Sequence, residues 1–148
     1  MYRNILIATD GSDLASKAVD HGVMLAKGMG ASVIFVTVTE NWPAVAMGPE
    51  FSQGIFVPIE NFEEMATKSA QKILAAAKTA AQGAGIECET LHVPDRAAAE
   101  GIIATANEKG CDLIVMASHG RRGLNRLVLG SQTTEVLAYS KVPVLVLR

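Results

Sequence analysis

Short apolar runs alternate along this chain with segments in which apolar residues recur every three to four positions. This alternation constrains the fold more than any other feature. The strand-like runs lie at 4–9, 32–39, 86–93, 112–118 and 142–148. Almost wholly apolar runs of this length are typical of strands covered on both faces, as in parallel sheets. The order βαβαβαβαβ predicts an α/β fold: one doubly wound five-stranded parallel sheet with helices on both faces, in a single domain over residues 1–148.

Helix signals fill the intervals between these runs. The first helix begins after Ser12, a favourable N-cap, and ends near Gly28 and Gly30. Asn61 followed by Glu64 resembles a capping box and predicts the start of the second helix. The side chains predicted to face the core along the second helix are Phe62, Met65, Ile73, Ala76 and Ala80. Met24 and Met29 of the first helix, like Met65, fall at helical spacing and are predicted to fill the core.

A long loop is predicted at about 41–60. That stretch holds three of the five prolines, two glycines and the single tryptophan. Loops longer than about 12–15 residues in a compact domain are usually binding loops, lids or disordered segments. With Trp42, Pro43, Phe51 and Phe56, this loop is a candidate surface for a protein partner.

Charge and cysteine content exclude several classes of function. Thirteen basic and fifteen acidic side chains give a formal net charge of −2, without the basic excess that binding to nucleic acid or to an acidic membrane requires. Cys88 and Cys111 form no Cys-x-x-Cys pair, so neither a disulfide framework nor a protein metal site is expected. The N-terminal run is too short for a signal peptide, and no stretch approaches the ~20 apolar residues of a membrane span, so we expect a cytoplasmic protein.

In open parallel sheets a ligand binds beyond the carboxyl ends of the strands, where the strand order reverses. If the order is 3-2-1-4-5, the first and fourth strands flank that crevice. Thr9 and Asp10 then face the stretch that begins at Ala117. If the order is 2-1-3-4-5, the third strand lies at the switch point and Pro94-Asp95 carries the chemistry. The glycines after the fourth strand favour the first order.

The stretch "ASHGRRGLNRLVLGS" at 117–131 has the features of an anion-binding loop. Gly120 has no Cβ to keep a ligand away from the backbone. Gly130-Ser131 precedes the last helix, whose first N–H groups lack internal partners and attract phosphate. The alternative is that both glycines only shape the loop and that Ser131 is an N-cap. A P-loop signature and the Gly-x-Gly-x-x-Gly dinucleotide signature are both absent from the sequence.

Three motifs together resemble those of the universal stress protein family, and the likeness covers essentially the whole chain. They are "ILIATDGS" at the start, "DLIVMASHGRRGLNRLVLGS" in the second half and "VPVLVLR" at the end. Nucleotide-binding members of that family carry Gly-x-x-Gly, nine residues, then Gly-Ser/Thr. In this chain the pattern begins at Ala117 instead of glycine, continues through Gly120, and closes with Gly130-Ser131.

The resemblance implies a nucleotide-binding site for ATP, with Mg²⁺ or Mn²⁺ accompanying the nucleotide. It implies that Asp10, beside Thr9, contacts the ribose or a phosphate-bound metal, and that the backbone near Val38 recognises adenine. The remaining residues implied are Met116 and Ala117 for base and sugar, and Gly120, Gly130 and Ser131 for the phosphates. The alternative for Asp10 is a local turn in which its carboxylate accepts from its own backbone. The family also implies a homodimer through the terminal strand Val142–Leu147.

Three functions follow in order of preference. The first is an ATP-binding stress-response switch. The sequence identifies no catalytic residue, so any ATP hydrolysis is expected to be slow. The second is a stress protein that binds no nucleotide and acts through protein contacts of the loop at 41–60. The third is an enzyme that cleaves ATP or transfers part of it.

Overall fold

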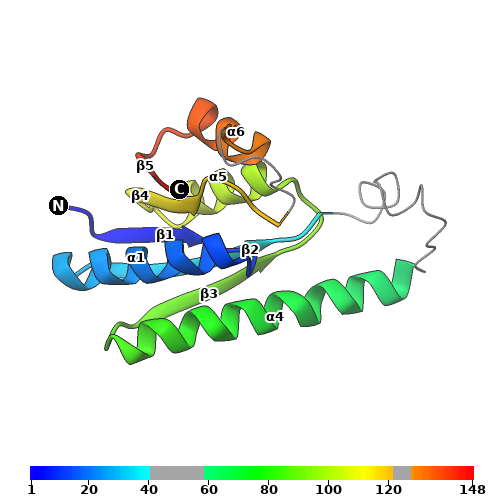
Figure 1. The fold of residues 1–148 in the computed structure, drawn as a ribbon, viewed down its shortest axis with the longest axis horizontal. Coiled ribbons are helices and arrows are strands. Elements are labelled where there is room, and N and C mark those ends of the chain that lie inside the picture. Colours follow the sequence, from blue (N-terminus) through cyan, green and yellow to red (C-terminus); the bar gives the residue numbers. More distant parts are fainter. Residues whose placement is uncertain (41–58, 122–127) are drawn as a thin grey trace.

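The computed structural model describes residues 1–40, 59–121 and 128–148 (Figure 1). The predicted loop at 41–60 therefore lies almost wholly outside the described residues. The strands and helices, in chain order, are β1 Asn4–Ala8, α1 Asp13–Met29, β2 Ser32–Val38, α4 Ile59–Gly83, β3 Cys88–Val93, α5 Ala98–Glu108, β4 Leu113–Ala117, α6 Ser131–Tyr139 and β5 Val144–Leu147.

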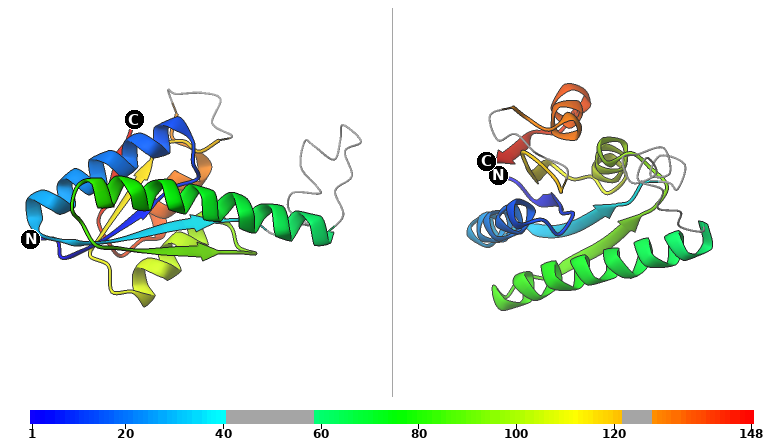
Figure 2. Two further views of the ribbon diagram at one scale, coloured as in Figure 1. Left: turned by 90° about the horizontal axis from the view of Figure 1, so that it is seen from below. Right: turned by 45° about the vertical axis from the view of Figure 1, so that its right-hand side comes forward.

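The five strands form one parallel sheet in the order β3-β2-β1-β4-β5, which confirms the predicted order 3-2-1-4-5. The alternative order, with β3 at the switch point, is therefore excluded. Helices α1 and α4 cover one face of the sheet, and α5 and α6 cover the other (Figure 2). Because the chain leaves β1 toward β2 on one side and reaches β4 on the other, the crevice lies between the ends of β1 and β4.

The core explains why the central runs are apolar at every position. Side chains of a strand alternate between its two faces, so Ile5 and Ile7 pack toward α1 and α4 while Leu6 packs toward α5 and α6. These three residues are fully buried, as is Phe35 of β2. Burial of such a side chain contributes about 1.5–3 kcal/mol. Both faces of the central strands therefore need apolar residues.

Helix α4 differs from its prediction in start and in orientation. It begins at Ile59, so Asn61 lies within the helix and the predicted capping box is wrong. Its N-terminal part extends beyond the end of the sheet, where Met65 is 63% exposed (Figure 1). The residues of α4 that are buried are Ala70, Leu74, Ala77 and Ala81. Of the predicted residues, Ala80 is half-buried and packs against this core, whereas Ala76 is exposed and lies one residue, or about 100° of helix rotation, from the buried Ala77.

The prediction that Met24 and Met29 fill the core is also wrong. Met24 is 72% exposed and Met29 is 38% exposed. In α1 the sheet is contacted instead by small residues such as Ala18 and Gly22. A Cβ on Gly22 would lie 2.5 Å from Ile7 Cδ1, so α1 packs too closely on β1 to admit a longer side chain there.

Asp112 ties the start of β1 to the turn before β4. Its carboxylate accepts the N–H of Arg3 at 2.8 Å and of Asn4 at 3.1 Å. Desolvation raises the pKa of this carboxyl, but the hydrogen bonds from Arg3 and Asn4 outweigh it, and the pKa lies below its ordinary value. A depressed pKa in the folded state stabilises the protein above the unfolded-state pKa, and this contribution disappears as the pH falls through the folded-state value.

We expect Asp112→Ala to lower the free energy of unfolding by about 1 kcal/mol at neutral pH, because two backbone donors lose a charged acceptor near the surface. The difference from the unsubstituted protein should shrink as the pH is lowered through the depressed pKa. Urea denaturation at a series of pH values measures both effects. Glu87→Ala, at an exposed carboxylate, is the control. An equal pH dependence in both variants would contradict the assignment.

Within the described residues, none of the helices has the combination of length and apolar character that a bilayer crossing requires.

Candidate functional site

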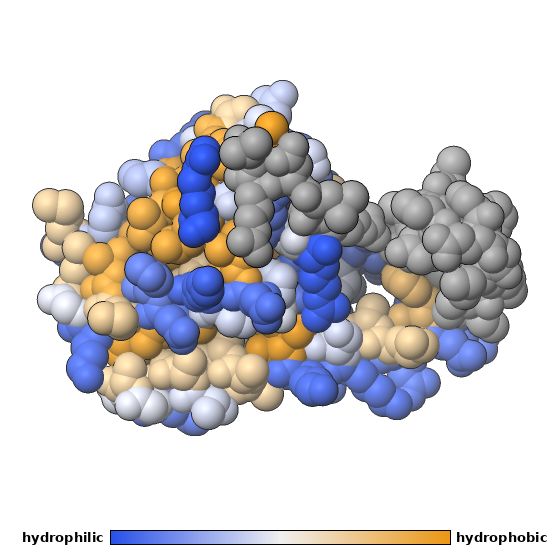
Figure 3. All heavy atoms as spheres, viewed as in Figure 1, coloured by the Kyte–Doolittle hydropathy of each residue, from blue (hydrophilic) through white to orange (hydrophobic). Residues whose placement is uncertain are grey.

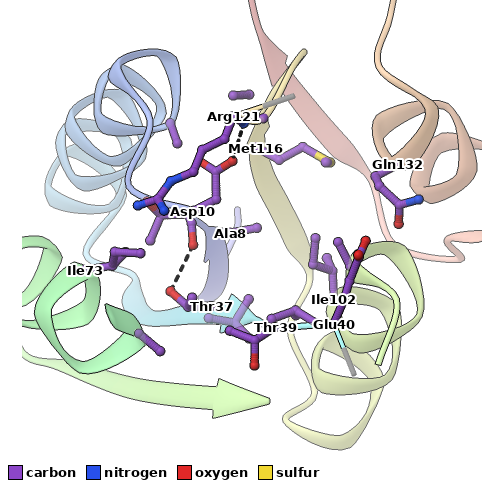
Figure 4. Close-up of a pocket in the computed structure, with 18 of the residues that line it drawn as sticks. Ala8, Asp10, Thr37, Thr39, Glu40, Ile73, Ile102, Met116, Arg121 and Gln132 are labelled. Atoms are coloured by element: carbon purple, nitrogen blue, oxygen red, sulfur yellow. Dashed lines mark hydrogen bonds between the residues drawn. The ribbon is translucent and has the colours of Figure 1, made fainter. Parts of the chain in front are cut away.

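A cavity of about 530 Å³ opens at the carboxyl edge of the sheet, where β1, β2 and β4 end (Figure 4). Small-molecule sites typically measure about 300–1,000 Å³. The eight residues predicted as nucleotide-binding all line this one cavity: Thr9, Asp10, Val38, Met116, Ala117, Gly120, Gly130 and Ser131. Strand order accounts for this, because it brings residues 9–10 beside residues 116–120 across the switch point.

The cavity has an apolar interior. It is formed by Ala8 of β1, Val36 and Val38 of β2, Met116 of β4 and Ile102 of α5. A Cβ on Gly101 would lie 2.8 Å from both methyl groups of Val38, so α5 packs directly against this wall. A flat apolar group such as a heteroaromatic ring fits an interior of this character.

Val38 also offers unpaired backbone groups to the cavity. Thr9 N–H donates to Val36 C=O at 3.0 Å, so the main chain of β2 faces β1 at Val36 and, two residues on, at Val38. Strand β1 ends at Ala8, so it does not extend as far as Val38. The Thr37 hydroxyl donates to Thr9 C=O at 2.9 Å (Figure 4). In the described part of the chain, the Val38 N–H and C=O have no partner. A donor and an acceptor side by side can pair with the edge of a base.

Asp10 forms the local turn that the sequence left open as an alternative. Its Oδ1 accepts from Ser12 N–H at 3.0 Å. Its Oδ2 accepts from Arg121 N–H at 2.8 Å, which joins the β1 turn to the loop after β4 (Figure 4). Both carboxylate oxygens are therefore already engaged with backbone donors, although each can accept a further bond.

This link gives a structural reason for glycine at 120. A Cβ on Gly120 would lie 2.6 Å from Asp10 Oδ2, closer than real Cβ atoms come to a neighbour. The φ of Gly120 lies outside the left-handed region, so lack of space and not backbone conformation requires glycine. From the sequence we expected Gly120 to make room for a ligand; the structure shows that it makes room for Asp10.

The N-terminus of α6 is the anion-attracting part of the cavity. Gly130 is the N-cap and Ser131 the first helical residue, so Ser131 is not the cap that the sequence allowed. Gly130 N–H donates to Ser118 C=O at 2.9 Å and is not available to a ligand. The N–H groups of Ser131, Gln132 and Thr133 have no intrahelical acceptor. None of them donates to another group in the described part of the chain.

Side chains outside the sequence motifs hold this edge in place. Thr133 is buried, and its hydroxyl lies 3.0 Å from Ala117 C=O and 3.1 Å from Ser118 C=O, which fixes α6 against the end of β4. Gln132 Oε1 accepts Ala99 N–H at 2.8 Å and so caps α5. Thr37, whose hydroxyl donates to Thr9 C=O, is the single polar residue inside the apolar part of the run 32–39. That isolated position is a signal by which the sequence could have identified it as a site residue.

His119, in the loop after β4, also lines the cavity. Its Nδ1 lies 3.0 Å from Ser118 Oγ, and its other ring nitrogen has no partner in the described part of the chain. His92 lies outside the cavity and pairs with Thr39 Oγ1 at 2.8 Å. Burial lowers the pKa of His92, against the opposing charge of Asp95.

Comparison with known proteins gives one consistent result. A family model described as the universal stress protein family matches residues 1–148. The universal stress protein YxiE of Bacillus subtilis is 36% identical over 151 aligned positions, which span both chains completely. The structure of MJ0577 of Methanocaldococcus jannaschii matches with a TM-score of 0.79 at 28% identity, over 99% of this chain and 96% of that one. A universal stress protein in complex with cAMP has the same fold, with a TM-score of 0.73 at 24% identity over 99% and 97% of the two chains.

Proposed function

Because this chain belongs to the universal stress protein family, we propose that it binds ATP at the carboxyl edge of its sheet and acts in the cytoplasm as a nucleotide-dependent switch in the stress response. One observation carries this proposal. The cavity combines an apolar interior with backbone groups at Val38 and three N–H groups at the start of α6 that have no partner among the described residues. The apolar interior matches the faces of a base, the groups at Val38 match its edge, and the N–H groups of α6 match phosphates.

The proposed contacts follow from this geometry. Val38 N–H and C=O would bond the edge of adenine, while Met116 and Ala117 would pack on the base and the ribose. The N–H groups of Ser131, Gln132 and Thr133 would donate to phosphate oxygens. A hydrogen bond to a charged group contributes about 1.5–3 kcal/mol, so three of them can hold a polyphosphate without a P-loop lysine.

A divalent ion would have to arrive with the nucleotide. Among the described residues, no group of three or more His, Cys, Asp or Glu side chains could hold a metal ion. Asp10 is the acidic residue at the phosphate side, and its oxygens already accept two backbone N–H groups. We propose that Asp10 uses the remaining acceptor capacity of its oxygens to bind Mg²⁺ or Mn²⁺ carried by the phosphates.

Isothermal titration calorimetry with Mg-ATP, adenosine and GTP tests the proposal. We expect Mg-ATP to bind more tightly than adenosine, because adenosine lacks the groups that α6 would hold, and more tightly than GTP, because the guanine edge differs in its donors. At a hundredfold excess over Kd, ATP should stabilise the folded protein by about 2.7 kcal/mol. The absence of both heat and thermal stabilisation at millimolar ATP would refute ATP binding.

The second candidate is a stress protein that acts through protein contacts. The aromatic residues of the 41–60 loop motivate it, and Ala117 in place of the family glycine leaves room for it. Partner capture that is insensitive to ATP and is lost when this loop is shortened would favour it. An ATP-cleaving or ATP-transferring enzyme ranks third, and would require turnover above background that disappears with Asp10→Ala.

We also propose that the protein forms a homodimer through β5. This strand is at the edge of the sheet, and the hydrogen bonds of Pro143 and Leu147 C=O to β4 leave the N–H and C=O of Val144 and Val146 facing outward. Figure 3 shows apolar surface over β4 and β5. The apolar or aromatic residues exposed around this edge are Leu137, Tyr139 and Leu145, at 43%, 72% and 39%. Pairing with a second copy would satisfy the backbone and cover these side chains.

We expect Leu145→Lys to weaken the dimer on the order of tenfold or more, because two-fold symmetry places the two introduced charges near each other. Light scattering coupled to size-exclusion chromatography, over a dilution series, measures the change. Met65→Lys adds the same charge at another exposed apolar position and should leave the mass unchanged. A dimer equally stable in both variants would contradict an interface at β5.

A further inference from the structure

A second cavity of about 460 Å³ lies in the groove between α1 and α4. We propose that this groove is a second anion site, which binds a phosphate group through Lys72 and Arg121. The two helices lie side by side on one face of the sheet (Figure 2). The site belongs to different residues from those proposed to hold the nucleotide phosphates, and the inference does not depend on ATP binding.

Small side chains create the groove. Helix α4 presents Ala76, Ala77 and Ala80 to it, and α1 presents Ser16 and Val19. Neighbouring helices usually fill the space between them with interdigitating larger side chains. Here the alanines leave an opening with an apolar floor, and its polar residues are Thr9, Ser16, Asp20, Ser69, Lys72 and Arg121.

Among the described residues, no carboxylate forms an ion pair with either cation of this groove. In the described part of the chain, the side chains of Lys72 and Arg121 make neither an ion pair nor a hydrogen bond. Lys68, one turn earlier on α4, differs because it pairs with Glu64 at 2.6 Å. Of the described residues that line the groove, Asp20 is the single carboxylate beside the two cations, so this part of the lining carries a net positive charge.

The guanidinium of Arg121 is located at the inner end of the groove. A Cβ on Gly11 would lie 3.0 Å from Arg121 Nη2 and 2.8 Å from Ile73 Cγ1, so both side chains pack over Gly11. Figure 4 shows Arg121 extending past Asp10 on the side of α1 and α4, with Ile73 below it. Lys72 is the neighbour of Ile73 in α4. A planar guanidinium with a flexible ammonium is a combination suited to the several oxygens of a phosphate group.

The groove is distinct from the phosphate position proposed at α6. Helices α1 and α4 cover one face of the sheet and α6 the other, and Figure 4 shows Gln132 of α6 across the first cavity from Arg121. The two cavities meet at Thr9, Ser69, Ile73 and Arg121. A phosphate in the groove can thus come from a separate phosphorylated molecule or from the tail of a nucleotide that turns toward α4.

Titration of the full chain with inorganic pyrophosphate, followed by amide chemical shifts, tests the site. We expect the largest shifts at Ser16, Ser69 and Lys72. Lys72→Gln and Arg121→Gln should each weaken pyrophosphate binding about tenfold, and Asp20→Asn should strengthen it, because a like charge is removed. Lys78→Gln, on the same helix outside the groove, should change the affinity less than twofold.

Two results would overturn the proposal. One is equal pyrophosphate affinity in Lys72→Gln and Lys78→Gln; the other is a set of shifts confined to Ser131–Thr133. Adding pyrophosphate to the ATP-saturated protein identifies the source. Displacement by ATP means that the nucleotide supplies the phosphate, and simultaneous binding means that a separate molecule does; both support the anion site. Adenosine shifts at Val38 test the nucleotide proposal independently, so the two can fail separately.

Discussion

Replacing Gly120 by alanine is expected to destabilise the protein and to disrupt the nucleotide cavity, although alanine is tolerated by the backbone conformation there. The added Cβ would lie 2.6 Å from Asp10 Oδ2, so either the carboxylate or the loop after β4 must move. Movement in either direction breaks the 2.8 Å bond from Arg121 N–H, which joins the loop to the β1 turn. Overpacking of this kind costs about 1–3 kcal/mol.

A double-mutant cycle identifies Asp10 as the cause. Asp10→Ala removes the carboxylate that Gly120→Ala would strike, so the double variant should lose less stability than the sum of the two single changes. We expect a coupling of roughly 0.5–3 kcal/mol, measured by urea denaturation. In thermal melts each kcal/mol corresponds to a shift of roughly 2–4 °C for a domain of about this size. Additive effects would show that the glycine serves another purpose, such as ligand approach.

Nucleotide binding should respond to the same cycle. Gly120→Ala is expected to weaken ATP binding at least about tenfold, since a displacement of the loop moves residues on both sides of the cavity. The double variant should recover part of the affinity if the loop returns to its original position once the Asp10 carboxylate is removed. Calorimetry on variants that remain folded separates this effect from the loss of stability.

The second large effect is expected from Ser131→Pro. Proline at the first position of a helix is compatible with its backbone, and Gly130 already has the extended conformation, φ −60° and ψ 151°, that proline requires of the preceding residue. The substitution removes one of the three N–H groups proposed to bind phosphate. A charge-assisted hydrogen bond of about 1.5–3 kcal/mol corresponds to a loss of roughly 10–150-fold in ATP affinity.

Ser131→Ala is the matched control for this prediction. It removes the hydroxyl and keeps the N–H, so the comparison of the two variants isolates the backbone donor. Adenosine should bind Ser131→Pro and the unsubstituted protein equally, because it carries no phosphate. If ATP affinity falls as much in the alanine variant, the hydroxyl and not the helix N-terminus holds the phosphate. If it falls in neither, the phosphates lie elsewhere, and the groove at Lys72 and Arg121 becomes the first place to test.

Residues that work through local backbone chemistry were predictable from the sequence. The apolar runs predicted the parallel sheet, and the glycine pattern favoured its strand order. Together with the resemblance to the universal stress protein family, they led to eight residues that line one cavity. Residues that act through tertiary contacts were not. The orientation of α4 depends on which stripe contacts the sheet, and a run of alanines offers little difference in hydrophobicity between Ala76 and Ala77.

The sequence by itself determined the alternation of strand and helix, and with it the sheet and the edge at which a ligand would bind, because periodicity and turn residues act over a few neighbouring positions. Only the tertiary structure decided that Gly120 accommodates Asp10, that Val38 has no backbone partner among the described residues, and that two cations face a groove between α1 and α4. Each of these depends on atoms far apart in the chain. The distance in space between these atoms is set by how closely the helices and strands pack, and no local sequence pattern encodes it.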